Sequence, residues 1–175
     1  MAIRKNLKLD ENSLWEYALR VLGQRACSSG ELRQKLAKRA ESPLIVTAVM
    51  SKLREYALAD DKKFSEAFAS SRLVNKGFGR FRVLRDLRSK RVSPAIAEQA
   101  VEKVFDGSDE RQLIEQFLAR KYRAVDLKEF LKEDKNLASV YRRLRTAGFG
   151  SGTSLAVLKR YNQRTEDWGD PEESE

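Results

Sequence analysis

The chain has 175 residues, of which 41% are hydrophobic and 35% are charged. Only 3 Pro and 9 Gly interrupt long stretches of Leu, Ala, Arg, Lys and Glu, so helices should dominate over strands. The composition therefore predicts an all-α protein with enough apolar material for a core.

The chain lacks histidine and has a single cysteine, Cys27. Ser-His and Cys-His catalytic arrangements, cysteine-based zinc sites and an intrachain disulfide are therefore excluded. No GxxxxGK[ST] phosphate loop occurs. We expect no catalytic residue, no metal site and no cofactor, and we interpret Cys27 as a small buried hydrophobe. The first residues lack the apolar segment of a secretory signal, so we expect a cytoplasmic protein without a membrane partner. We also expect a monomer.

Charge is distributed unevenly along the chain. The net charge is +9, but residues 165–175 contain six acids and no Lys or Arg, so residues 1–164 carry +15. Such a body attracts polyanions, of which nucleic acid is the commonest, although an acidic protein groove would also fit. We interpret residues 163–175 as an acidic, disordered tail that could shield the basic surface. Trp168 within it is not explained by disorder.

Apolar residues at helical spacing define a three-helix unit over residues 13–57. Its helix starts are marked by cap signals: Asn12 or Ser13, Ser28 with Glu31 at capping-box spacing, and Ser42 with Pro43.

The same unit recurs over residues 58–106, because Pro94 lies 51 residues after Pro43. That one shift superposes positions from all three helices: Tyr17 on Phe68, Ala18 on Ala69, Leu22 on Leu73, Leu32 on Val83, Leu36 on Leu87, Ser42 on Ser93, Ile45 on Ile96 and Leu53 on Val104. A looser third copy spans residues 107–162, with an insertion near 126–134. We expect three tandem three-helix repeats that stack into an elongated, curved array.

Two motifs have both a chemical and a structural interpretation. Asp60 and Asp61 could hold Mg²⁺ for phosphodiester cleavage, but an N-cap and a first-turn acid are favoured, since neighbouring side chains at a helix start diverge. The triplets 77–79 and 148–150, both Gly-Phe-Gly, are interpreted as helix stops with the phenylalanine buried.

Cations concentrate in the second and third units. Residues 72–91 contain eight cations and one acid, Asp86, whereas solvated helix faces normally alternate in sign. We interpret the cations as partner- or DNA-binding residues. They are Arg72, Lys76, Arg80, Arg82, Arg85, Arg88, Lys90, Arg91, Arg142, Arg143, Arg145, Lys159 and Arg160.

The stretch from Leu58 to Phe68, followed by Arg72 and then by residues 77–83, resembles the central signature of the RecX family of recombinase regulators. Residues around Ala18-Leu19, Glu31-Leu32 and Gly148-Phe149 resemble its flanking repeats, so the likeness covers about residues 13–162. The chain departs from the family pattern at three places: Ala40-Glu41 where a glycine turn is expected, Ser65 where alanine is usual, and Arg91 where glycine is common.

The resemblance implies a protein that lodges in the groove of a RecA filament on single-stranded DNA. It implies lower ATPase, strand-exchange and co-protease activity of that filament, and hence roles in DNA repair, homologous recombination and the SOS response. Double-stranded DNA is a further candidate partner. The alternative function is general DNA binding by helix-turn-helix-like basic units, although the basic helix has almost no Asn or Gln to read adenine.

Overall fold

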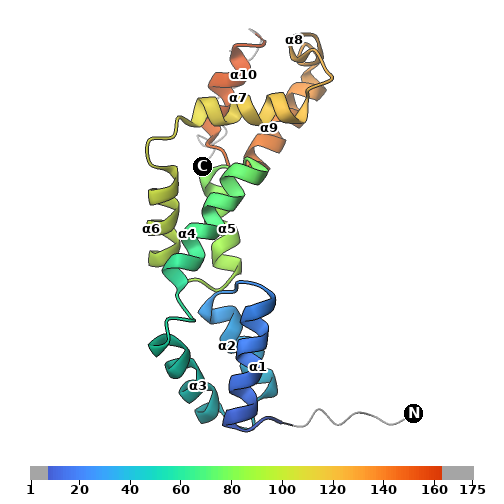
Figure 1. The fold of residues 1–175 in the computed structure, drawn as a ribbon. Helices are drawn as coiled ribbons and strands as arrows, with labels where there is room; N and C mark the ends of the chain where they lie inside the picture. Colours follow the sequence, from blue (N-terminus) through green and yellow to red (C-terminus); the bar gives the residue numbers. More distant parts are fainter. Residues whose placement is uncertain (1–7, 163–175) are drawn as a thin grey trace, which may run out of the picture. The chain divides into compact units, whose positions relative to one another are not determined.

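The computed structural model describes residues 8–162, which are almost entirely helical (Figure 1). The helices in chain order are α1 (Glu11–Gln24), α2 (Ser29–Arg39), α3 (Pro43–Glu55), α4 (Asp61–Ser71), the π-helix η1 (Arg72–Lys76), α5 (Arg80–Ser89), α6 (Pro94–Phe105), α7 (Glu110–Lys121), α8 (Leu127–Phe130), α9 (Asp134–Ala147) and α10 (Ser151–Lys159). No strand occurs among these residues, and the single β-bridge joins Leu9 to Ala40. The predicted all-α fold is confirmed.

The described chain forms two compact units. Unit 1 contains residues 8–68 and 86–100, and unit 2 contains residues 69–85 and 101–162. The boundary between the units runs through α4, α5 and α6, the three helices of the second predicted repeat. The division into three repeats at residues 13–57, 58–106 and 107–162 stays a prediction.

Unit 1 is built around a bundle in which α1, α2 and α3 pack against one another in pairs (Figure 1). Apolar residues at i, i+4 and i+7 of α1 supply one side of its core, with Leu14 and Ala18 fully buried. Leu32 and Leu36 of α2 and Leu53 of α3 are equally buried. These are the positions that the helical spacing predicts.

Unit 2 has a separate core formed mainly by α7, α9 and α10. Ile114 and Leu118 of α7 pack with Leu144 of α9 and Val157 of α10, and all four side chains are fully buried. The predicted insertion near 126–134 contains the short helix α8. Leu131, directly after α8, is buried in the same core, so the inserted segment contributes to packing.

The helix starts agree with the predicted caps in two of three cases. Ser28 accepts a hydrogen bond from the Glu31 N–H at 3.0 Å, and Ser42 accepts one from Ile45 at 3.4 Å. The prediction of Asn12 or Ser13 as the first cap is wrong, because Asp10 caps α1 by accepting from the Ser13 N–H at 2.8 Å. This hydrogen bond lowers the pKa of the Asp10 carboxyl.

The positions that depart from the family pattern have distinct local structures. Ala40 is extended (φ −67°, ψ 148°) and forms the bridge to Leu9, so no glycine turn is needed there. Arg91 has φ +61°, a left-handed conformation that glycine adopts without strain. Ser65 is fully buried, and its hydroxyl has no hydrogen-bond partner within the described chain. Glycine would therefore suit position 91 better than arginine, and alanine would suit position 65 better than serine.

The acidic tail, residues 163–175, lies outside the described residues. Within the described part, no helix is both long and apolar enough to span a membrane.

Candidate functional site

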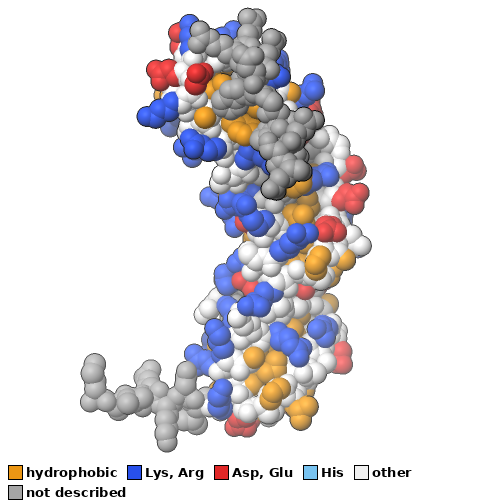
Figure 2. Space-filling model, turned by 180° about the vertical axis from the view of Figure 1, so that it is seen from behind, with side chains coloured by type: hydrophobic (Ala, Val, Ile, Leu, Met, Phe, Trp, Pro, Cys, Tyr) orange, Lys and Arg blue, Asp and Glu red, His pale blue; other side chains and the backbone are white. Residues whose placement is uncertain are grey.

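The cations that the sequence singles out lie mainly at the surface. Ten of the thirteen are exposed, while Arg72, Arg82 and Lys90 are half-buried. Helix α5 presents four of them, namely Arg80, Arg82, Arg85 and Arg88. Figure 2 shows Lys and Arg side chains spread over the face that it displays, with some Asp and Glu between them.

Arg88, Lys90 and Arg91 lie in unit 1, where the first two have acidic partners. Arg88 pairs with Glu98 at 3.0 Å, and Lys90 pairs with the half-buried Glu31 at 3.1 Å. Arg91 packs against Gly30 at the start of α2. Lys90 and Arg91 therefore help to hold α2 against the loop before α6, which makes them poorer candidates for binding a partner than their charge alone indicates.

In unit 2, the two Gly-Phe-Gly triplets pack directly against each other. The Gly79 N–H donates to the Ala147 carbonyl at 2.8 Å, and the Phe81 N–H donates to the Gly148 carbonyl at 3.1 Å. Gly77 and Gly148 both have positive φ and end η1 and α9, as predicted for helix stops. A side chain at Gly148 would overlap the backbone of Arg82. The triplets thus join the start of α5 to the end of α9.

This junction borders a groove of about 510 Å³, which we call the basic groove. Its lining comes from η1, α5, α7 and α9 and from Phe78, which follows η1. The lining residues are Asn75, Lys76, Phe78, Arg82, Phe117, Arg120, Lys121, Arg143, Thr146 and Ala147. Five are cations, and no Asp or Glu of the described residues lines the groove. Its volume falls within the usual range for ligand sites, about 300–1,000 Å³.

Hydrogen bonds and ring contacts hold three of these cations in place. The Arg82 guanidinium lies 5.0 Å from the centre of the Phe78 ring and donates to the Thr146 carbonyl at 3.3 Å. Arg143 lies 5.7 Å from the Tyr122 ring, and Arg120 donates to the Asn75 carbonyl at 3.3 Å. These contacts fix the groups in advance of binding, which reduces the entropy that a ligand must offset.

The remaining two cations of the groove, Lys76 and Lys121, are exposed. Neither has a hydrogen bond or ion pair from its ammonium group to any described residue. The positive charges of these two lysines and of the neighbouring cations repel one another, so an anionic ligand would relieve the repulsion.

A second hollow of about 450 Å³ in unit 2 is lined by Arg85 and Arg145 together with Phe81 and the start of α10. Arg145 donates to the Phe149 carbonyl at 2.8 Å, and Arg85 makes a longer contact of 3.5 Å with the Thr146 carbonyl. The N–H of Gly150, at the start of α10, is already bound by Glu110 at 2.9 Å. That carboxylate weakens this hollow as an anion site.

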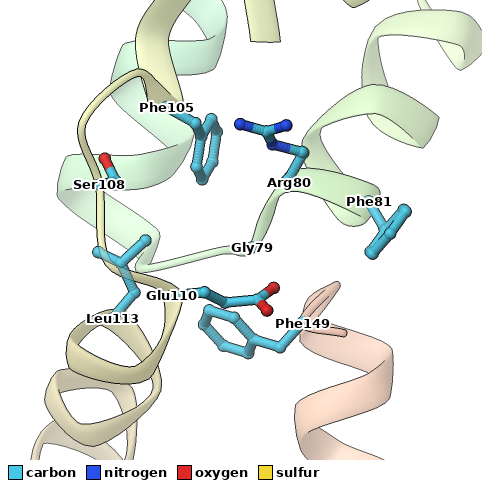
Figure 3. A pocket seen from close by; sticks show the side chains of 8 residues that line it. All are labelled: Gly79, Arg80, Phe81, Phe105, Ser108, Glu110, Leu113 and Phe149. Atoms are coloured by element: carbon cyan, nitrogen blue, oxygen red, sulfur yellow. The ribbon is translucent and has the colours of Figure 1, made fainter. Parts of the chain in front are cut away.

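A third, smaller hollow of about 240 Å³ lies on another side of the triplet junction (Figure 3). Phe105, Leu113 and Phe149 make it largely apolar, and the Glu110 side chain points between Gly79 and Phe149. Arg80 lies over the Phe105 ring at 6.0 Å. Because Arg80 lies against a ring and Glu110 already accepts the Gly150 N–H, this hollow has a structural character.

Other predicted cations of unit 2 lie outside the basic groove. Arg142 donates to the Ala138 carbonyl of its own helix, and Arg160 forms an ion pair with Glu115. Lys159 is exposed at the end of α10. Of the thirteen predicted residues, the groove brings together only Lys76, Arg82 and Arg143.

The residues with alternative chemical interpretations have structural roles. Asp60 accepts hydrogen bonds from the N–H groups of Lys62 and Lys63, both at 3.0 Å, and so caps α4. Asp61 accepts from the Ser29 N–H at 2.6 Å. Within residues 8–162, no cluster of three or more potential metal-binding side chains occurs. Cys27 is buried, and this burial raises the pKa of its thiol.

Sequence reasoning missed Arg120 and Lys121, although they supply two of the five cations of the groove. They end an ordinary amphipathic helix, and only tertiary packing brings α7 beside η1 and α9. The run Arg120-Lys121-Tyr122-Arg123 was the available signal.

Comparisons with known proteins point to a single family. The model described as "RecX, second three-helix domain" matches residues 60–101, and "RecX, first three-helix domain" matches residues 15–53. The regulatory protein RecX of Streptomyces coelicolor is 30% identical over 156 residues, which cover 87% of this chain and 81% of that protein.

Two further matches agree. The regulatory protein RecX of Halorhodospira halophila is 38% identical over 85 residues, 49% of this chain and 52% of that relative. The crystal structure of RecX from Lactobacillus salivarius has a TM-score of 0.68 at 18% identity and covers 88% of this chain and 97% of that one. At this identity the structural likeness shows the fold alone.

Proposed function

Because the chain belongs to the RecX family of regulatory proteins, we propose that it binds the RecA recombinase filament on single-stranded DNA and regulates it. Binding lowers the ATPase, strand-exchange and co-protease activities of the filament. No catalytic residue is needed for this role. The protein acts as a monomer in the cytoplasm, where recombinase filaments assemble.

The basic groove is the observation that supports this proposal best. It combines five cations with two phenylalanines and has no carboxylate in its described lining. A filament on single-stranded DNA offers such a groove two anionic partners, the DNA phosphates and acidic side chains of the recombinase. The remaining predicted cations are proposed to add long-range attraction.

The alternative, general binding to duplex DNA through helix-turn-helix-like units, has less support from unit 2. Such units insert the start of a basic helix into the major groove. Here the backbone at the start of α5 is held against α9, since the Gly79 and Phe81 N–H groups donate to carbonyls at the end of α9 and Gly148 packs on Arg82. Arg82 and Arg85 both donate to the Thr146 carbonyl, and Arg82 is half-buried.

The proposed function is tested by the single-strand-dependent ATPase of a recombinase with this protein at substoichiometric concentration. We expect a progressive loss of ATP hydrolysis. Unchanged hydrolysis at concentrations that saturate the filament would contradict the proposal. Mg²⁺-dependent cleavage of DNA that Asp61→Ala abolishes would instead support the nuclease interpretation of Asp60 and Asp61.

A further inference from the structure

We propose that the basic groove is a site for single-stranded DNA, in which cations hold the phosphates and a base packs against Phe78 and Phe117. This inference rests on the proposed function and deepens it, since it selects DNA over an acidic protein segment as the ligand of the groove. It also assigns a role to Arg120 and Lys121, which the sequence pattern did not single out.

The cations of the groove are suited to a phosphate backbone. They come from four separate helices and surround one hollow: Lys76 from η1, Arg82 from α5, Arg120 and Lys121 from α7, and Arg143 from α9. A flexible polyanion with regularly spaced charges can contact such a distribution, and each neutralised phosphate releases a counterion. Affinity should therefore fall steeply with salt concentration.

The aromatic residues favour a single strand over an acidic peptide. Phe78 and Phe117 are half-buried and both line the groove between the cations. Nonspecific single-strand sites combine a positive groove with aromatic side chains on which unpaired bases stack. Bases in a duplex stack on each other and cannot use this surface, and an acidic peptide gains little from it.

The groove is also built as a fixed site. Arg82 covers one side of the Phe78 ring, and the Phe117 ring packs edge-on against the buried Phe149 at 5.6 Å between ring centres. The five-residue π-helix η1 ends beside the groove, and the left-handed Gly77 directs the chain into Phe78. Interruptions of this kind inside a helical run often occur at functional sites.

The phosphate contacts are tested with the double variant Lys76→Gln/Lys121→Gln. Binding of an oligothymidylate of about 12 nucleotides, a common site size, is followed by fluorescence anisotropy at several salt concentrations. The slope of log K against log salt is negative, and we expect it to become shallower by about 0.7 for each lost contact. The matched control Lys128→Gln/Lys135→Gln removes two exposed lysines of unit 2 outside the groove and should leave the slope unchanged. Equal slopes in both double variants would overturn the inference.

Base stacking is tested with Phe78→Leu, which keeps an apolar side chain against the core. We expect about tenfold weaker binding of the oligothymidylate, because the variant removes an aromatic ring on which a base stacks. Binding of an abasic oligonucleotide of the same length should not change. Phe81→Leu, a change at an exposed phenylalanine that does not line the groove, is the control and should bind like the wild type.

Other ligands give different results. Equally tight binding of duplex DNA or of poly-glutamate, or equal loss of abasic and thymidylate binding in Phe78→Leu, would overturn the single-strand assignment. Recombinase inhibition is measured separately with the same proteins. Inhibition by a wild type that does not bind oligothymidylate overturns this inference and leaves the proposed function standing. DNA binding that depends on the groove, without inhibition of the recombinase, overturns the proposed function and leaves this inference standing.

Discussion

The Ser65 hydroxyl is buried in α4 without a hydrogen-bond partner in the described chain. Burial removes such a hydroxyl from water, and without a hydrogen bond in the protein this desolvation destabilises the folded state.

The glycines of the triplet junction are constrained by close packing of the backbone. There the backbones approach so closely that no side chain fits at Gly148, which also has φ +93°.

We predict that Ser65→Ala stabilises the protein. The change removes the unsatisfied hydroxyl and should raise the free energy of unfolding by about 1 kcal/mol beyond any gain in helix propensity. Ser70→Ala, at an exposed position of the same helix, measures the propensity gain alone. Equal stabilisation by the two changes in denaturant titrations would contradict this explanation.

Gly148→Ala should destabilise the protein by about 3 kcal/mol, because it combines left-handed strain with overlap against Arg82. Gly152→Ala is the control, since a methyl group at that helical position of α10 meets nothing within 4 Å. It should leave stability unchanged or raise it by up to about 1 kcal/mol. Similar melting temperatures for the two variants would show that the triplets do not pack as described.

Among the elements of unit 1, α2 is attached at its start by several contacts. The Ser28 hydroxyl donates to the Lys90 carbonyl, Asp61 accepts from the Ser29 N–H, and Glu31 pairs with Lys90. The expected capping box is therefore only half present. Ser28 caps the helix, but the Glu31 carboxylate bonds to Lys90 and to Arg25 at 3.8 Å. The Glu31 carboxylate thus pairs with Lys90, from elsewhere in unit 1, instead of with the backbone N–H of Ser28.

A double-mutant cycle on Glu31→Gln and Lys90→Met should give a coupling energy of about 1 kcal/mol. The Glu31 and Lys90 side chains are only 17% and 28% exposed, so solvent screens the pair incompletely. The exposed pair Arg88 and Glu98, at 53% and 58%, is the matched comparison and should give about 0.5 kcal/mol or less. Equal coupling energies for the two pairs, measured by chemical unfolding, would contradict a structural role for Lys90.

How far the sequence predicts these elements depends on how local the signal is. The starts of α3 and α6 follow from the Ser-Pro pairs at 42–43 and 93–94, because capping and the proline φ act within a few residues. The first cap was assigned wrongly, since Asp10, Asn12 and Ser13 are all good caps and local sequence does not rank them. The basic groove could not be predicted, because its residues meet only through the packing of α7 and α9 around the triplets.

At the scale of the whole molecule, the net charge acts over longer distances than any single contact between residues. Residues 1–164 carry +15 and residues 165–175 carry six acids. The chain belongs to a family of regulatory proteins, and the described residues supply one groove that is lined by five cations. The hypothesis that the acidic segment shields the basic surface concerns residues outside the described range, and it is tested by solution binding.

Deletion of residues 165–175 should increase affinity for single-stranded DNA several-fold at low salt, because six negative charges are removed from a chain that binds a polyanion. The gain should vanish near 1 M salt, where the Debye length is about 3 Å. Unchanged affinity at low salt would refute shielding by this segment. Substituting its six acids with the corresponding amides provides a control for chain length.

The most direct test of recombinase regulation is sedimentation of the fluorescently labelled protein with three ligands. These are RecA filaments assembled on single-stranded DNA with a nonhydrolysable ATP analogue, the bare single strand, and a duplex of equal length. We predict that filaments retain the protein at concentrations where the duplex retains almost none, and that Lys76→Gln/Lys121→Gln weakens this retention. Equal retention by filaments and by bare duplex would contradict it.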